Sequence, residues 1–147
     1  MWSAEGAAAV DRNSVFWIDG GRGSAVRKII LKIQLLTNVR ADEFFLDYWV
    51  RYYGDIFGRK NLHIMLDGDD WETNVDLTGV NLHVVPDVPR KRSERLRFTA
   101  VWQSRFAKKL LRKGTDLVLR TDIDEFLAVD PKAGIELPDF LARLEPG

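Results

Sequence analysis

The 147-residue chain contains no cysteine, which excludes disulfide bonds and thiolate metal sites. It has no run close to the roughly 18 consecutive apolar residues of a membrane-spanning helix, and its first residues lack the pattern of a signal peptide. It also has no excess of one charge, because 22 basic residues match 22 acidic ones. We therefore expect a cytoplasmic protein with no membrane span and no nucleic-acid partner.

Two common nucleotide-binding motifs are missing as well. Neither the G-x-G-x-x-G fingerprint of dinucleotide-binding folds nor the G-x-x-x-x-G-K-[ST] sequence of a P-loop occurs anywhere in the chain. A site of either kind is disfavoured. Apolar residues nevertheless make up 46% of the chain, which is enough for one packed core and argues against disorder. We expect an irregular leader over residues 1–25 and one folded domain over residues 26–147.

Predicted strands and helices alternate along that domain. Short apolar or β-branched runs predict strands at residues 29–36, 61–66, 81–85 and 117–119. Helical periodicity predicts a helix that begins near residues 42–43 and ends between Gly54 and Gly58, a second over residues 94–113, and a third that begins at residue 138. Such alternation predicts an α/β protein, with a mainly parallel sheet between layers of helices. Residues 15–18 form either an extra edge strand or part of the leader.

Aromatic residues recur at helical spacing in the first of these helices. Phe45, Trp49, Tyr52 and Ile56 are expected to form its core face. The two histidines, His63 and His83, lie in predicted strands without other ligand residues at metal-binding spacing, so we expect hydrogen-bonded strand residues.

The charges are unevenly distributed along the second half of the chain. Residues 90–113 contain ten basic residues against one acidic residue, and residues 114–147 contain eight acidic against three basic. A basic helix followed by an acidic loop suits a diphosphate held between both signs of charge. A solvated helix face is the alternative for the basic run.

Two carboxylates, Asp122 and Asp124, follow the apolar strand at residues 117–119. Side chains two residues apart on an extended chain point the same way, so both acids can face one point. Carboxylates held that close repel each other unless a cation neutralises them. Oxygen ligands at the end of a strand suit Mg²⁺ or Mn²⁺ that carries a phosphate-bearing substrate.

The spacing alone is a weak signal. With 15 aspartates in the chain, about 1.5 Asp-x-Asp matches are expected by chance, and Asp67-Gly68-Asp69 is a second match. The position of Asp122 and Asp124 after a buried strand and a basic helix favours a metal–phosphate site, because strand ends are where α/β proteins bind ligands. A solvated acid cluster is the alternative.

These residues also fit a known pattern. Residues 39–46 with Trp49 and Tyr52, then Asp67 after a strand, then the D-x-D-E-F-L block at residues 122–127 resemble glycosyltransferases of the family 2-like type. The resemblance covers roughly residues 28 to 145. It implies the GT-A fold, a three-layer sandwich that binds nucleotide sugars. The acceptor-binding half of the family lies beyond the matching residues, so the resemblance implies an N-terminal, nucleotide-sugar-binding part, truncated at its C-terminus.

The resemblance also implies roles for individual residues. Asp122 and Asp124 would hold Mn²⁺ or Mg²⁺ on the diphosphate of a nucleotide-diphospho-sugar donor, with Asp124 the more direct ligand. Substrate-binding roles fall to the side chains at the strand ends and at the start of the basic helix, namely Thr37, Asn38, Arg40, Asp67, Arg95 and Arg97. The sugar would pass to an acceptor, which could be a glycan, a lipid or a protein.

Two other functions stay open at this point. One is a non-catalytic module that binds a nucleotide or another protein without turnover. The other is a metal-dependent phosphatase with an aspartate nucleophile, which also uses an apolar strand ending in D-x-D. Those enzymes favour a small hydroxyl-bearing or β-branched residue two positions after the second aspartate, where this chain has Phe126.

Overall fold

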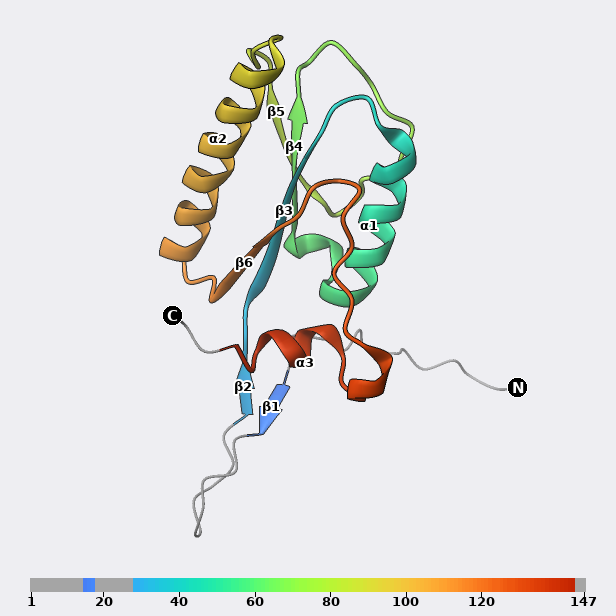
Figure 1. Ribbon diagram of the computed structural model, residues 1–147, viewed down its shortest axis with the longest axis vertical. Coiled ribbons are helices and arrows are strands. Elements are labelled where there is room, and N and C mark those ends of the chain that lie inside the picture. The colour runs from blue at the N-terminus through green and yellow to red at the C-terminus, as the bar shows by residue number, and fades with distance from the viewer. Residues whose placement is uncertain (1–14, 18–27, 145–147) are drawn as a thin grey trace, which may run out of the picture.

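A four-stranded sheet forms the centre of the computed structural model, which describes residues 15–17 and 28–144 (Figure 1). All strands of this sheet are parallel and lie in the order β5-β4-β3-β6. They are β3 (Ile33–Val39), β4 (Leu62–Asp67), β5 (Asn81–Val85) and β6 (Leu117–Arg120). A separate antiparallel pair joins β1 (Val15–Trp17) to β2 (Lys28–Ile30). Apart from β1, the predicted leader lies outside the described residues.

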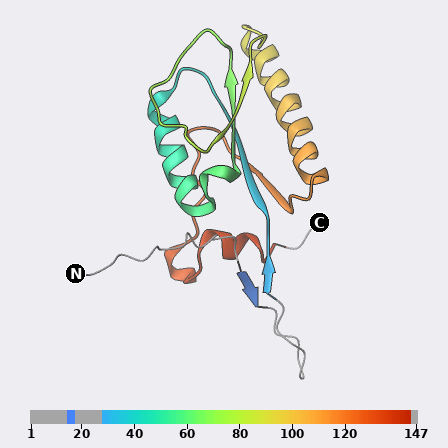
Figure 2. The same ribbon diagram turned by 180° about the vertical axis from the view of Figure 1, so that it is seen from behind.

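Helices cover both faces of the central sheet. α1 (Glu43–Phe57) lies on one face and α2 (Arg92–Arg112) on the other, as the front and back views show (Figures 1 and 2). α3 (Leu137–Leu141) lies at the end of the sheet where β3 begins. Two short 3₁₀ turns, η1 (Arg59–Asn61) and η2 (Pro131–Ala133), complete the elements. The predicted α/β class with a parallel sheet between helices is confirmed.

The strand order changes direction beside β3. From β3 the chain passes outward through α1 to β4 and then to β5, whereas α2 brings it back to β6 on the other side of β3. The two connecting helices, α1 after β3 and α2 before β6, lie on opposite faces of the sheet. In open α/β sheets such a switch point opens a crevice at the carboxyl ends of the strands, where ligands bind.

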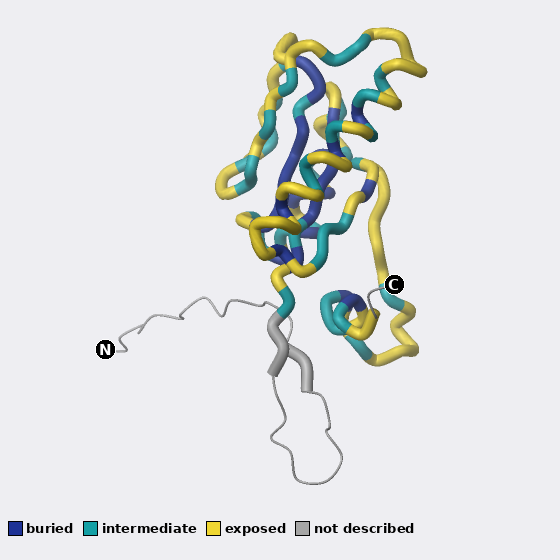
Figure 3. The backbone as a smooth tube through the Cα atoms, turned by 90° about the vertical axis from the view of Figure 1, so that its left-hand side faces the viewer, coloured by how far each residue is buried: buried dark blue, intermediate teal, exposed yellow. Residues whose placement is uncertain are grey.

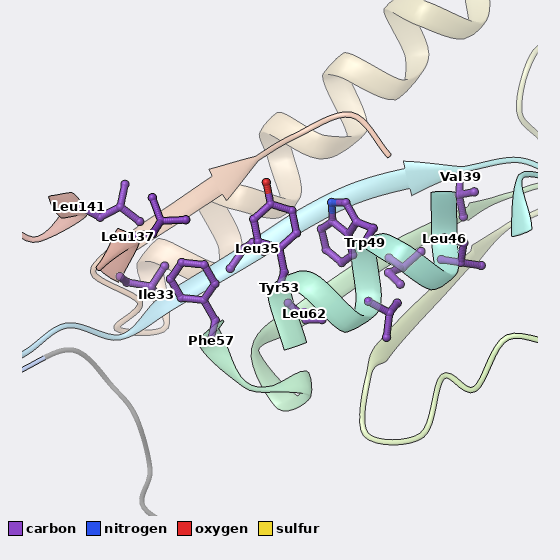
Figure 4. Packing of buried hydrophobic residues seen from close by; sticks show 12 residues of the cluster. Ile33, Leu35, Val39, Leu46, Trp49, Tyr53, Phe57, Leu62, Leu137 and Leu141 are labelled. Carbon is purple, nitrogen blue, oxygen red and sulfur yellow. The ribbon is translucent and has the colours of Figure 1, made fainter. Parts of the chain in front are cut away.

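The main core lies between the sheet and α1, where side chains of β3 and α1 meet (Figure 4). The predicted core face of α1 is confirmed in part, because Tyr52 and Ile56 pack against the core cluster that contains Trp49. Trp49 is fully buried as expected, but Phe45, Tyr52 and Ile56 are only partly buried. The residues of α1 that are buried are Leu46, Trp49, Val50, Tyr53 and Phe57. This face lies directly over β3, and Tyr52 packs at its edge with its hydroxyl on the chain after β6.

The other helix, α2, is held by few buried residues. Only Thr99, Gln103 and Leu110 are buried, and most of its outer surface is exposed (Figure 3, which views the molecule from this side). The Gln103 side chain donates a hydrogen bond of 2.9 Å from Nε2 to Asn38 Oδ1 on β3. Among the described residues no helix combines the length and the apolar character needed to cross a membrane.

Candidate functional site

A cleft of about 390 Å³ lies at the carboxyl end of the sheet, at the switch point between β3 and β6. It contains six of the eight predicted site residues, namely Asn38, Arg40, Asp67, Arg95, Asp122 and Asp124. A second hollow of about 400 Å³ continues toward the end of β5 and shares Arg40, Asp67 and Arg95 with the first. The two hollows together form one groove across the ends of the strands, and we call it the strand-end cleft.

Two predicted site residues lie elsewhere. Thr37 is fully buried, and its hydroxyl has no hydrogen-bond partner. Because Leu35 and Val39 belong to the core under α1, the alternation of the strand turns Thr37 toward that helix. Arg97 lines a different groove, on the side of α2 that faces β5. Neither residue lines the strand-end cleft.

The two acids of the D-x-D sequence line the same wall of the cleft, and both are exposed. They lie in a tight turn after β6. The backbone N–H of Glu125 donates to the carbonyl of Asp122 at 3.1 Å, and the Glu125 carboxylate accepts from the N–H of Asp122 at 3.2 Å. Arg120 Nη2 lies 3.7 Å from Asp122 Oδ1. The local sequence thus keeps both carboxylates outside the core and facing the cleft.

Aromatic side chains of α1 hold this turn by hydrogen bonds. Trp49 Nε1 donates a buried hydrogen bond of 2.9 Å to Thr121 Oγ1, directly before the first acid. The Tyr53 hydroxyl donates to the carbonyl of Glu125 at 3.1 Å and accepts from the N–H of Leu127 at 2.8 Å. The Tyr52 hydroxyl donates to the carbonyl of Leu127 at 2.6 Å. The turn is therefore tied to α1 on both sides of the acids.

Ring contacts reinforce the same attachment. Phe126 stacks against Tyr53 with ring centroids 6.1 Å apart and planes 6° from parallel. Its edge meets Tyr52 at 5.4 Å and 84°. Aromatic pairs in these geometries stabilise beyond the area they bury. The bulky residue two positions after the second acid thus has a packing role, which a small hydroxyl-bearing residue could not fill.

Arg40 joins the loops that follow β3 and β4. Its Nη1 donates to the carbonyl of Asp67 at 2.7 Å, and its guanidinium pairs with both carboxylate oxygens of Asp70 at 2.9 Å. This pair raises the pKa of Arg40 and lowers the pKa of Asp70. Gly68 permits the arrangement, because its φ is +94° and a Cβ there would collide with Arg40 Nη1 and lie 2.5 Å from Asp70 Oδ1. We call this arrangement the Arg40 clamp.

Asp67 is the one buried acid of the cleft, with 4% of its surface exposed. Burial raises the pKa of its carboxyl group, and the positive charges of Arg40 and Arg95 partly oppose that increase. Its backbone carbonyl also accepts from Trp71 Nε1 at 3.1 Å. A buried carboxylate with its backbone held in this way is a fixed acceptor for a ligand N–H or O–H group.

The residues that fix this geometry were not all expected from the sequence. Asp70 and Gly68 were missed as parts of the Arg40 clamp, although an Asp-Gly-Asp-Asp sequence after a strand signals a turn with positive φ. The roles of Thr121 and Tyr53 were also missed. The spacing of aromatic residues in α1 was visible, but no sequence pattern states that their polar atoms reach a loop more than 70 residues away.

The donor atoms of the cleft suit a hard divalent cation. Asp122 and Asp124 offer carboxylate oxygens, which Mg²⁺ and Mn²⁺ prefer. Within residues 15–17 and 28–144 no group of three or more acidic or histidine side chains is placed to hold a metal ion. Mg²⁺ sites on phosphate substrates typically use one or two carboxylates, with water and phosphate oxygens as the other ligands, so a pair of aspartates fits that type.

Comparison with known proteins adds no identification: no protein-family model, no curated protein and no solved structure matches the chain. The resemblance to family 2-like glycosyltransferases therefore remains a prediction from the residues themselves.

Proposed function

We propose that the strand-end cleft binds a nucleotide-diphospho-sugar through a divalent metal ion, as the donor-binding part of a glycosyltransferase with the GT-A fold. One observation carries this proposal. Both acids of the D-x-D sequence line one cleft at the switch point of a parallel sheet, together with Asn38, Asp67 and Arg95. A solvated acid cluster without a ligand would not be expected to line a cleft together with a buried acid and the basic start of a helix.

The two aspartates would hold Mn²⁺ or Mg²⁺. When bound, such an ion offsets the negative charge that develops on the nucleoside diphosphate as it leaves. In the transfer, the acceptor oxygen forms a bond to the anomeric carbon and its proton passes to a base or to solvent. The bond from that carbon to the diphosphate breaks, and the electron pair leaves with the diphosphate. The role of the chain is to hold the two carboxylates where that charge appears. The anchors from Trp49 and Tyr53 serve this purpose, because they fix the backbone on both sides of the acids.

Other residues of the cleft would bind the remaining parts of the donor. Arg95, in the first turn of α2, would contact diphosphate oxygens, and the backbone N–H groups at the start of that helix favour an anion at the same end. Asp67 would accept a hydrogen bond from the base or the ribose. Asn38 would contact the nucleotide with its side chain held by Gln103. Arg40 would act mainly as a positioning residue, because two of its nitrogens are used in the clamp.

The melting temperature tests this proposal. We expect UDP or GDP to raise it only when Mn²⁺ is present, since a ligand at 100 times its dissociation constant adds about 2.7 kcal/mol of stability. The variant Asp124→Ala should lose the metal-dependent shift while its own melting temperature stays close to that of the wild type, because the side chain is exposed. Asp55→Ala, which changes an exposed acid at the far end of α1, should keep the shift.

The same panel separates the functions that the sequence left open. A shift accompanied by hydrolysis or transfer of a nucleotide sugar supports the transferase, and a shift without turnover supports the non-catalytic module. A colorimetric phosphatase assay with Mg²⁺ addresses the phosphatase. If no nucleotide raises the melting temperature with or without Mn²⁺, the proposed donor site is wrong.

A further inference from the structure

A separate hollow borders the strand-end cleft at Pro89. It measures about 890 Å³ and lies between β5 and α2, and none of its lining residues is an acid of the D-x-D sequence. We call it the α2–β5 groove. Its walls are mainly apolar and include Val84, Phe98, Val101, Trp102 and Phe106. Val101 leaves 43% of its surface exposed, which is costly for an aliphatic side chain that has no partner.

The floor of the groove is a fixed set of rings. Trp102 and Phe106 stack in parallel, with centroids 5.1 Å apart and planes 5° from parallel. His83 contacts Phe106 at 4.4 Å and is held from below by His63, whose Nδ1 lies 3.2 Å from His83 Nε2. Trp102 and Phe106 each cover one face of the other ring, so the floor is a packed aromatic surface.

The rim of the groove carries positive charge. Arg97, Arg105 and Lys109 line it together with a single acid, Glu94, and all four are exposed. Within residues 15–17 and 28–144, none of the three basic side chains is in an ion pair. Residues 90–113 as a whole contain ten basic residues against one acidic residue, although the net charge of the chain is zero. A basic helix with an apolar groove beside it complements a molecule that is apolar and negatively charged at one end.

We propose that the α2–β5 groove binds anionic phospholipid at the surface of a membrane. An acyl chain would lie along the apolar floor, and the phosphate groups would contact Arg97, Arg105 and Lys109. This peripheral contact needs no membrane-spanning segment. It goes beyond the proposed sugar-donor site and does not depend on it, because Pro89 is the one lining residue that the groove shares with the strand-end cleft.

Co-sedimentation of the full chain with lipid vesicles tests the proposal. We expect binding to vesicles of phosphatidylcholine with 30% phosphatidylglycerol, at roughly 0.1 M salt, and at least about tenfold weaker binding to phosphatidylcholine alone. The double variant Arg105→Glu/Lys109→Glu should weaken binding to the anionic vesicles by at least about tenfold, since each basic residue close to an anionic surface contributes about a fivefold factor.

Matched variants on α2 distinguish binding in the groove from a general effect of positive charge on the helix. Lys108→Glu/Arg112→Glu makes the same change in charge at exposed positions that do not line the groove, and it should weaken binding clearly less. For the apolar floor, Val101→Asp should reduce binding, whereas Leu111→Asp should not. Both are exposed aliphatic residues of α2, with 43% and 45% of their surface exposed, and only Val101 lines the groove. Circular dichroism checks that each variant is folded.

Several results would overturn the proposal. They are equal binding to neutral and anionic vesicles, no binding to either, or equal effects of the groove variants and their matched controls. Two measurements without lipid identify other occupants. A dimer in light scattering that Val101→Asp dissociates would assign the groove to a second copy of the chain. If the chain does not bind vesicles but binds a single-stranded oligonucleotide, and if Arg105→Glu/Lys109→Glu abolishes that binding, the groove is a nucleic-acid site.

Discussion

Trp49 on α1 and Thr121 at the end of β6 are joined by a buried hydrogen bond of 2.9 Å from the indole Nε1 to the threonine Oγ1. Thr121 directly precedes Asp122, the first of the two acids. The helix that connects β3 to β4 therefore fixes the loop that follows β6. The position of the acids depends on the core of the protein, although the acids themselves are exposed.

A double-mutant cycle measures this connection. Trp49→Phe removes the indole donor, and Thr121→Val removes the acceptor while its shape is nearly kept. We expect each change to lower the free energy of unfolding, the first by about 2 kcal/mol because volume is also lost, and the double variant to lose about 1 kcal/mol less than the sum. Urea denaturation gives the values. If the two effects add to within about 0.3 kcal/mol, the hydrogen bond contributes no coupling.

The Tyr53 hydroxyl gives a second prediction. It makes two hydrogen bonds to the backbone of the loop, so Tyr53→Phe should lower the free energy of unfolding by about 1–2 kcal/mol. It should also speed hydrogen exchange at the Leu127 amide, which donates to that hydroxyl at 2.8 Å.

Tyr48→Phe is the matched control, because this tyrosine lies on the outer face of α1 with 54% of its surface exposed. It should leave both the stability and the Leu127 exchange rate unchanged. Equal exchange at Leu127 in the two variants would show that the loop does not depend on Tyr53.

Gly68 gives a third prediction, which concerns the Arg40 clamp. Gly68→Ala combines strain at φ +94° with a collision against Arg40 Nη1 and Asp70 Oδ1, so the ends of both paired side chains have to shift. Gly114→Ala is its matched control, because Gly114 has a similar φ of +86° but open space around its Cβ position. Strain alone should cost the control about 1–2 kcal/mol.

The comparison between the two glycine variants isolates the clamp. Gly68→Ala should be the less stable variant in urea denaturation and should also weaken the nucleotide-dependent shift in melting temperature. Gly114→Ala should keep the full shift. If Gly68→Ala leaves nucleotide binding unchanged, the Arg40 clamp plays no part in the proposed site.

Much of the fold could be predicted from the sequence because its signals are local. The strand at residues 81–85 has the predicted bounds, and the predicted helices differ by a few residues at their ends. The aromatic spacing of α1 predicted the helix and placed Trp49, Tyr52 and Ile56 on its core side. It did not distinguish partly buried Tyr52 from fully buried Tyr53, because the two are equally apolar in a sequence pattern. Which tyrosine enters the core depends on where β3 and the chain after β6 lie.

The site was predictable where it rests on strand ends and not where it rests on long-range contacts. Asn38, Asp67 and Asp122 follow or end strands that are neighbours in a parallel sheet, so they meet at one edge. Thr37 was expected there too, but the alternation of β3 turns it toward α1. Arg97 was expected beside Arg95, but two residues on a helix lie about 200° apart, so Arg97 faces the α2–β5 groove.

The histidine pair predicts how stability depends on pH. Burial, together with the nearby His83, lowers the pKa of His63 from 6.5 to about 4, and burial and the charge of Lys109 lower the pKa of His83. Between pH 6.5 and pH 4 the unfolded chain therefore binds more protons at these positions than the folded chain. Stability should fall as the pH drops through this window, by about 1–2 kcal/mol for His63 after allowance for nearby solvent.

Urea denaturation at pH 7 and pH 5 checks the sign. The wild type should lose more stability between these values than His63→Leu, which cannot take up the proton. The same loss in both proteins would show that His63 does not contribute and that His83 or the carboxylates account for the acid dependence.

The most direct test of the metal site is a titration with Mn²⁺, in which electron paramagnetic resonance measures the free ion in the presence of UDP or GDP. We predict that the wild type and Asp55→Ala remove more free Mn²⁺ than the nucleotide does alone, and that Asp122→Ala and Asp124→Ala remove no more than the nucleotide. If the aspartate variants bind as much Mn²⁺ as the wild type, the two carboxylates do not hold a metal ion on the donor.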